Sequence, residues 1–240
     1  MKKLKEMGVR ALIVSIDDFH QEFIHRDRVI NVIRACKEIH LEVKLQFVAT
    51  KSSGRLADFL HEHGDDLLNI ECREIPCHPV GRASFKIKDE SLFTTKGVPQ
   101  GLCPSSVMSI SAYGKVIPCC NTAGHLPSLE VGDISQSIIP LHKKFLKDPI
   151  FNLLRLKGPK AFYESAINMG YNPREDGYID QCHLCYDLFK NNQLAEELKD
   201  FAAENFEHEL YETYLEEYTN NYSQILNMNN KESNTSNHSL

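Results

Sequence analysis

The sequence predicts a mixed α/β fold, because patterns typical of strands and of helices alternate along its first third. The first apolar run is rich in branched residues and ends at two aspartates, which is typical of a strand buried on both faces of a parallel sheet. Helical spacing follows, then an apolar/polar alternation, and the cycle repeats. The expected order is strand, helix, strand, helix, strand over residues 11–16, 27–40, 41–49, 52–64 and 67–75. The short connections favour parallel strands joined by right-handed crossovers.

Single residues mark the expected helix ends. Asp27 can cap the first helix, and Ser52 or Ser53 can cap the second. Gly64 is placed to end the second helix.

The first strand has little chain before it. Residues 2–7, at most a short helix, precede a strand whose composition predicts cover on both faces. At an open edge, such a strand would leave backbone groups unpaired and apolar surface exposed. We therefore expect the sheet to continue upstream of Met1.

Charge excludes one class of partner. The 240 residues hold 33 acidic and 27 basic side chains, and residues 187–218 alone hold ten acids and two lysines. The rest of the chain has no concentrated basic face, so we expect no nucleic-acid partner.

Whether the eight cysteines form disulfides or bind metal depends on the cellular compartment. Lysines precede the apolar run at residues 11–16, but six residues are too few for a signal peptide, and no stretch is long enough to span a bilayer. We predict a cytoplasmic protein without a membrane partner. In a reducing compartment, clustered cysteines are metal ligands or reactive thiols more often than disulfides.

The rest of the chain changes character. Residues 107–112 and 115–117 predict a hairpin around Gly114, and residues 135–170 look helical between several prolines. Residues 191–218 predict an acidic amphipathic helix. Residues 219–240 hold seven asparagines and four serines and predict a disordered tail.

Cysteine spacing is the most informative motif. Ten residues separate Cys103 from Gly114, four more precede Cys119, and Cys182 and Cys185 form a later Cys-x-x-Cys. Four thiolates brought together suit Zn²⁺ or a [4Fe–4S] cluster. Cys120 could replace Cys119 as a ligand. The alternative without a metal is that Cys119 and Cys120 are ordinary buried cysteines and that Cys182 and Cys185 are a chance pair. His183, inside the Cys-x-x-Cys, is expected to be exposed rather than a ligand.

These cysteines carry a resemblance. Cys-x10-Gly-x4-Cys with a distant Cys-x2-Cys is similar to the auxiliary-cluster extension, of the SPASM or twitch kind, of radical S-adenosylmethionine enzymes. Three further segments resemble that superfamily: Val-Ser-Ile-Asp-Asp-Phe-His at its fourth barrel strand, His-Pro-Val-Gly-Arg-Ala after its sixth, and Val-Gly-Asp-Ile after the auxiliary hairpin, at residues 14–20, 78–83 and 131–134. The resemblance spans about residues 5–190.

The resemblance implies a fold and its boundaries. It implies the C-terminal half of a (β/α)6 barrel over residues 1–83, made of the last three βα units. A SPASM/twitch-like auxiliary domain of β-hairpin and helices would follow over residues 84–190, then the acidic helix at 191–218 and the tail at 219–240.

Two departures from the family stand out. No cysteine follows Cys185, so at most one auxiliary cluster fits. The family's Cys-x3-Cys-x2-Cys, which holds the cluster that cleaves S-adenosylmethionine, is absent, since Cys36 is the first cysteine. The resemblance therefore implies a chain that is inactive alone. It is either the product of a split or truncated gene or one half of a two-chain enzyme, whose partner would be a separate N-terminal half that carries Cys-x3-Cys-x2-Cys.

Roles for other residues follow from the resemblance. Ser15 and Asp17 would face the ribose and amino-acid portion of S-adenosylmethionine, and Arg82 its region near the sixth strand. The alternatives are that Asp17 and Asp18 cap a loop and that Arg82 pairs with an acid. Polar side chains at the carboxyl ends of parallel strands do point into a ligand crevice.

Two functions of different classes remain. The first is an oxidoreductase-type radical S-adenosylmethionine protein with one [4Fe–4S] cluster on Cys103, Cys119, Cys182 and Cys185. Family chemistry is hydrogen abstraction by a 5′-deoxyadenosyl radical, here from a peptide or a small molecule. The second is a non-catalytic interaction module that binds zinc through the same four cysteines.

Overall fold

The structure, a computed structural model, describes residues 1–105 and 107–235, the last twenty-one of them by their backbone alone. The chain divides into two compact units, Met1–Thr95 and Lys96–Leu240. The first unit therefore extends twelve residues beyond the barrel boundary predicted at residue 83. Leu92, which lies in this added segment, is fully buried.

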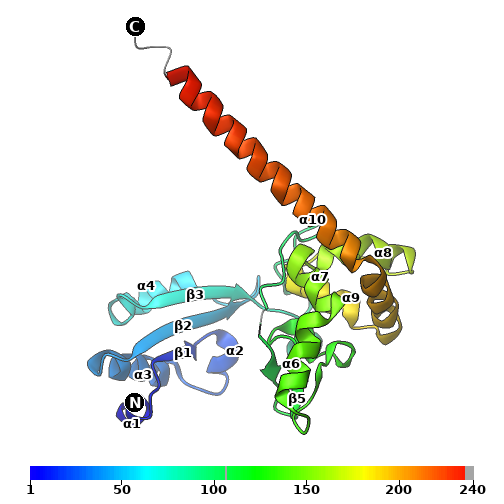
Figure 1. The fold of residues 1–240 in the computed structure, drawn as a ribbon. Coiled ribbons are helices and arrows are strands. Elements are labelled where there is room, and N and C mark those ends of the chain that lie inside the picture. The colour runs from blue at the N-terminus through cyan, green and yellow to red at the C-terminus, as the bar shows by residue number, and fades with distance from the viewer. Residues whose placement is uncertain (106, 236–240) are drawn as a thin grey trace. The chain divides into compact units, whose positions relative to one another are not determined.

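Unit 1 is built on a three-stranded parallel sheet with helices between its strands (Figure 1). Ala11 pairs with Glu42 and Lys44 with Glu71. The strands, in the order β1-β2-β3, are β1 (Ala11–Ser15), β2 (Glu42–Ala49) and β3 (Glu71–Pro76). The helices are α1 (Lys2–Glu6), α2 (Asp18–Gln21), α3 (Arg26–Glu38), α4 (Leu56–Leu67), α5 (Ala83–Lys86) and the 3₁₀ turn η1 (Asp89–Ser91). The predicted element order and parallel pairing are confirmed.

One face of the sheet packs against α3 and α4. Every second residue of β2 is buried, as the alternation in the sequence predicts. Leu45 and Phe47 of β2 share one apolar cluster with Ile33 of α3 and Phe59 of α4.

β1 differs from its prediction. Ile13, in the middle of the strand, is 68% exposed, so cover on both faces is wrong for the described residues. Among those residues β1 pairs with β2 alone. The other edge of β1 and one of its faces are therefore open to further contact.

Three predicted helix ends also differ. Asp27 lies in the first turn of α3, which is capped by His25 instead. α4 continues through Gly64 to Leu67, with a kink at His63. Neither Ser52 nor Ser53 caps α4; Oε2 of Glu74, on β3, accepts from the Leu56 amide at 2.7 Å. A cap from a neighbouring strand cannot be read from local sequence.

Unit 2 combines a small antiparallel sheet with short helices (Figure 1). Its strands are β4 (Ser109–Ile110), β5 (Lys115–Ile117) and β6 (Gly132–Asp133). The predicted hairpin is confirmed, and Gly114 has the positive φ of +74° that its turn requires. The helices are α6 (Ile138–Lys147), α7 (Pro149–Lys157), α8 (Tyr163–Asn168), α9 (Gln181–Phe189) and α10 (Asn192–Thr235), with the 3₁₀ turns η2 (Thr122–His125), η3 (Pro127–Leu129) and η4 (Pro159–Phe162).

The core of unit 2 lies between its helices. Five side chains with no exposed surface come from α7, η4 and α9: Leu153, Phe162, Leu184, Leu188 and Phe189. The start of α10 closes this core through Ala195, Leu198 and Ala202, which are also fully buried.

α10 is longer than the predicted acidic helix. Its backbone continues over residues 219–235, which the sequence predicts as part of a disordered tail, while residues 236–240 of that tail lie outside the described residues. In Figure 1 the later part of α10 projects beyond the other helices of unit 2. None of the helices in the described part of the chain is long and apolar enough to cross a membrane.

Two leucines of α10 test which part of the helix is held by packing. We expect Leu198→Ala, which empties a fully buried site, to lower the free energy of unfolding by about 2–5 kcal/mol. The same substitution at Leu210, which is 48% exposed, is expected to cost less than about 1 kcal/mol. Urea denaturation followed by circular dichroism measures both, and equal losses would contradict this packing.

Candidate functional site

Four cysteines, distant in sequence, lie close to one another in unit 2. Cys103 is in the loop before β4, where its amide donates to the Leu154 carbonyl of α7 at 3.0 Å. Cys119 lies between β5 and η2, and Cys182 and Cys185 are in the first half of α9. Cys103, Cys119 and Cys185 line one small cavity of about 30 Å³.

The Cys-x-x-Cys lies at a capped helix start. The Asp180 side chain accepts from the His183 amide at 2.9 Å and so begins α9. Thiolates at a helix N-terminus are stabilised by the dipole and by free amides. The start of α9 therefore places Cys182 in the first turn and Cys185 one turn later.

A buried polar network joins α9 to the loop that precedes it. The Tyr171 hydroxyl donates to Oδ2 of Asp187 at 2.5 Å, and the Tyr178 hydroxyl lies 2.5 Å from that of Tyr171. Nζ of Lys190 donates to the other oxygen of Asp187 at 2.5 Å. Asp187 is 3% exposed, so this network ties the helix with the two cysteines to the preceding loop.

The electrostatics of the thiols show that they share one environment. Burial raises the pKa of Cys119, of Cys182 to about 12, and of Cys185 well above its ordinary value. Negative charge at Cys103 raises all three pKa values further, and charge at Cys119 also raises those of Cys182 and Cys185. Ionising several of these thiols together is therefore unfavourable unless a cation compensates.

The donor set fits such a cation. Four thiols in an apolar setting match a tetrahedral zinc site or a cubane iron–sulfur cluster. In the described part of the chain, however, no three His, Cys, Asp or Glu side chains are arranged to hold one metal ion as they stand. The four thiols are gathered without forming a finished coordination sphere.

Cys120 lies apart from this group. Its residue is exposed, and it does not line the cavity that Cys119 shares with Cys103 and Cys185. Nδ2 of Asn121, the next residue, donates to Sγ of Cys182 at 3.1 Å. Of the two adjacent cysteines, Cys119 is the one beside the other thiols.

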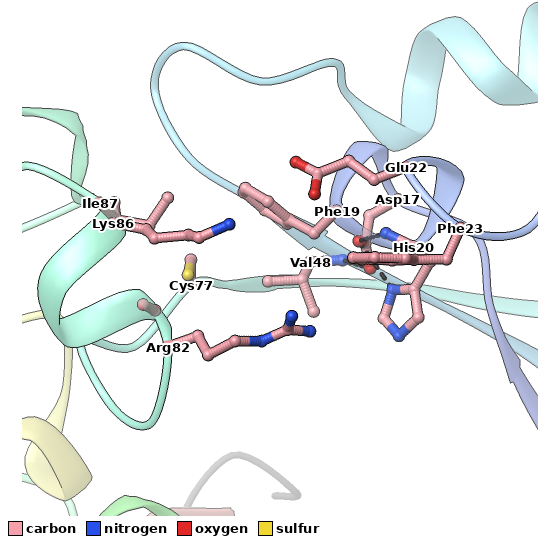
Figure 2. Close-up of a pocket in the computed structure, with 11 residues that line it drawn as sticks. Asp17, Phe19, His20, Glu22, Phe23, Val48, Cys77, Arg82, Lys86 and Ile87 are labelled. Carbon is pink, nitrogen blue, oxygen red and sulfur yellow. Dashed lines mark hydrogen bonds and ion pairs between the residues drawn. The ribbon is translucent and has the colours of Figure 1, made fainter.

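A second cavity, of about 230 Å³, lies in unit 1 at the carboxyl ends of β1 and β3 (Figure 2). Figure 2 shows Arg82 and Lys86 reaching from the α5 side toward Phe19, His20 and Phe23, with Cys77 between them. Of the three predicted S-adenosylmethionine contacts, Asp17 and Arg82 line this cavity. Ser15 is absent from its lining.

Both carboxylate oxygens of Asp17 already have polar partners within the protein. Its carboxylate has no exposed surface; Oδ1 accepts from the His20 amide at 3.2 Å and lies 2.8 Å from Nδ1 of His20. Oδ2 accepts from the Val48 amide at 3.1 Å. Asp17 therefore caps α2 and ties β1 to β2, and the capping alternative describes its carboxylate.

Asp18 and Arg82 differ in how they fit their alternative roles, which are a loop cap for Asp18 and an ion pair for Arg82. Oδ2 of Asp18 accepts from the Gly54 amide at 2.7 Å and holds the loop after β2, as the capping alternative describes. The Arg82 guanidinium lies over the Phe23 ring, with its central carbon 5.4 Å from the ring centroid. No carboxylate among the described residues forms an ion pair with Arg82, so it is available to a ligand in the cavity.

Comparison with known proteins finds a distant relative that matches most of the chain. It is 24% identical over 219 residues to "Putative peptide biosynthesis protein YydG" of Bacillus subtilis (strain 168). The match covers 85% of this chain and 67% of that protein, so it is not confined to one of the two units. No family model matches the chain.

The expectation for His183 is wrong. The residue is 1% exposed, its Nδ1 accepts from the Ile179 amide at 3.2 Å, and its ring packs edge-on against Tyr178. The spacing of the Cys-x-x-Cys marks only the two cysteines, whereas the direction of the intervening histidine depends on the loop before α9.

Gly124 is a site residue that sequence reasoning missed. A Cβ on Gly124 would lie 2.0 Å from the Cys119 carbonyl oxygen and 2.8 Å from its Sγ. The turn η2 therefore passes the cysteine at a distance that only glycine permits. Nothing in the local sequence distinguishes this glycine from an ordinary loop glycine.

Gly124 tests whether the geometry around Cys119 matters for metal. We expect Gly124→Ala to displace Cys119 and to lower bound metal at least several-fold, measured by elemental analysis of purified protein. Gly64→Ala is the matched control, since a Cβ there meets nothing within 4 Å and alanine favours a helix interior. Unchanged metal content in Gly124→Ala would contradict this role.

Proposed function

We propose that the chain is an iron–sulfur protein of the radical S-adenosylmethionine superfamily, with one auxiliary [4Fe–4S] cluster held by Cys103, Cys119, Cys182 and Cys185. The observation that carries the proposal is that thiols from three distant segments converge on one apolar cavity. The order and spacing of the cysteines in the sequence support the family, and the likeness to YydG supports its substrate class.

The residues around the cavity suit a cluster. Cys182 and Cys185 would supply thiolates from a helix start, while Cys103 and Cys119 would supply them from loops fixed by α7 and η2. When bound, an auxiliary cluster of this kind supplies a contact for substrate or a route for electrons. The mostly apolar side chains that line the cavity would limit the access of water to a cluster held there.

A peptide is the proposed substrate class. The relative's name assigns it to peptide biosynthesis, and the match spans most of this chain. Family chemistry on such a substrate is hydrogen abstraction by a 5′-deoxyadenosyl radical. A cytoplasmic location belongs to the same proposal.

The cavity in unit 1 is the proposed site for S-adenosylmethionine. Arg82 and Lys86 offer positive charge for its carboxylate, and Phe19 and Phe23 offer apolar surface for the rest of the molecule. Asp17 would act as a positioning residue, because its buried carboxylate reaches the cavity through His20. A role for Ser15 would need a ligand that extends beyond the cavity.

The open edge of β1 is the proposed place for the rest of the barrel. Ile13 is exposed there, and β1 pairs only with β2 among the described residues. Further parallel strands at this edge would pair the free backbone groups of β1, and the elements packed on the extended sheet would cover the exposed face that carries Ile13. The Cys-x3-Cys-x2-Cys that the family needs would come with those strands, on whatever polypeptide encodes them.

A zinc-binding interaction module is the second candidate, because the same four thiols suit Zn²⁺. Anaerobically purified protein separates the two. Brown protein with broad visible absorption, iron and labile sulfide supports the cluster. Colourless protein with one zinc per chain and no sulfide would refute it.

Adjacent cysteines provide a matched pair for the ligand set. We expect Cys119→Ala to lose most of the bound iron and sulfide, because it removes a thiol from the shared cavity. Cys120→Ala is expected to keep wild-type iron and sulfide, because Cys120 is exposed and outside that cavity. The reverse result would assign the ligand to Cys120.

Radical initiation needs the cluster that Cys-x3-Cys-x2-Cys holds. This chain, reconstituted anaerobically and mixed with dithionite and S-adenosylmethionine, is therefore expected to yield no 5′-deoxyadenosine by liquid chromatography and mass spectrometry. A complete radical S-adenosylmethionine enzyme assayed in parallel is the positive control. Sustained 5′-deoxyadenosine formation by this chain would contradict the proposal that the initiating cluster is held by strands that this chain lacks.

A further inference from the structure

A cationic side chain lies at the cysteine cavity. Arg155, on α7, lines the same 30 Å³ space as Cys103, Cys119 and Cys185. The rest of the lining is mostly apolar, so a charge placed there acts through little solvent. No part of the cysteine motif points to this arginine.

Three contacts fix the guanidinium in place. Nη2 donates to Oδ1 of Asn152 at 2.6 Å and to the Phe145 carbonyl at 3.4 Å. The guanidinium carbon also lies 4.8 Å from the centroid of the Phe145 ring, a cation–π geometry. A side chain held in this way keeps its charge beside the cavity instead of turning into solvent.

The charge of Arg155 is not cancelled by an acid. No carboxylate in the described ranges forms an ion pair with it, although Asp148 acts on it from longer range. Burial lowers the pKa of the Arg155 guanidinium, and negative charge at Cys103 raises it, ahead of Asp148. Arg155 therefore lies beside the candidate ligands Cys103, Cys119 and Cys185 with no carboxylate paired to it in the described ranges.

We propose that Arg155 sets the reduction potential of the cluster held by the four cysteines, by stabilising the extra negative charge of its reduced form. This inference rests on the proposed function. Reduction adds one electron, taken from an external low-potential donor, to a centre that four thiolates already make negative. A fixed positive charge favours that reduced state and so raises the potential.

Substitutions at Arg155 separate charge from packing. Arg155→Met removes the charge and keeps much of the length, Arg155→Gln is a second neutral variant, and Arg155→Lys retains the charge. Arg34→Met is the control for net charge, because Arg34 pairs with Asp66 on the surface of the other unit. Redox titration with dithionite, followed by electron paramagnetic resonance, gives the potential of each protein.

We expect both neutral variants to be harder to reduce by about tenfold in the equilibrium constant, which is about 59 mV for a one-electron couple. Arg155→Lys and Arg34→Met are expected to titrate near the wild type. Loss of the cluster in both neutral variants but not in Arg155→Lys would also support an electrostatic role.

Three results would overturn the proposal. One is an equal potential in wild type, Arg155→Met and Arg155→Gln at equal cluster content. The second is loss of the cluster in Arg155→Lys as well, which would assign Arg155 to packing. The third is a wild-type chain that takes up zinc and no iron, which refutes the proposed function itself and is recognised before any variant is made.

Discussion

Several thiols of unit 2 are held in one mostly apolar space: Cys103, Cys119 and Cys185 line the same small cavity, and Cys182 interacts electrostatically with Cys103 and Cys119. Burial and mutual repulsion both disfavour their ionised forms, as the raised pKa values of Cys119, Cys182 and Cys185 show. A bound cation or cluster would remove that penalty, and contacts in the surrounding fold hold the cysteine-bearing segments in place. α9 is capped and tied down by Asp187, while η2 comes close to Cys119 only because residue 124 is glycine.

Unit 1 also buries a group that can carry negative charge, in this case a carboxylate. Asp17 is completely buried at the end of β1, and the amides of His20 and Val48 compensate its charge. This leaves the ring of His20, with Arg82 and Lys86, to face the cavity. The buried negative charge of Asp17 would therefore act on a ligand through the ring of His20, whereas Arg82 and Lys86 could touch the ligand directly.

Sequence patterns predicted the parts of the structure that depend on local periodicity. The alternation in β2 and the turn at Gly114 each have a short-range cause, and both are found. The cap of α4 by Glu74, the burial of His183 and the position of Arg155 depend on which segments meet in space. The spacing of the cysteines predicted which thiols to compare, but the choice between Cys119 and Cys120 needed their different exposure.

The central claim is that one iron–sulfur cluster lies between the four cysteines. Anomalous diffraction at the iron edge, from crystals of anaerobically purified protein, tests it most directly. We expect the iron signal of one four-iron cluster, with each of the four irons within bonding distance of the Sγ of one of Cys103, Cys119, Cys182 and Cys185. A peak that appears at the zinc edge alone, or an iron peak bound to other residues, would contradict it.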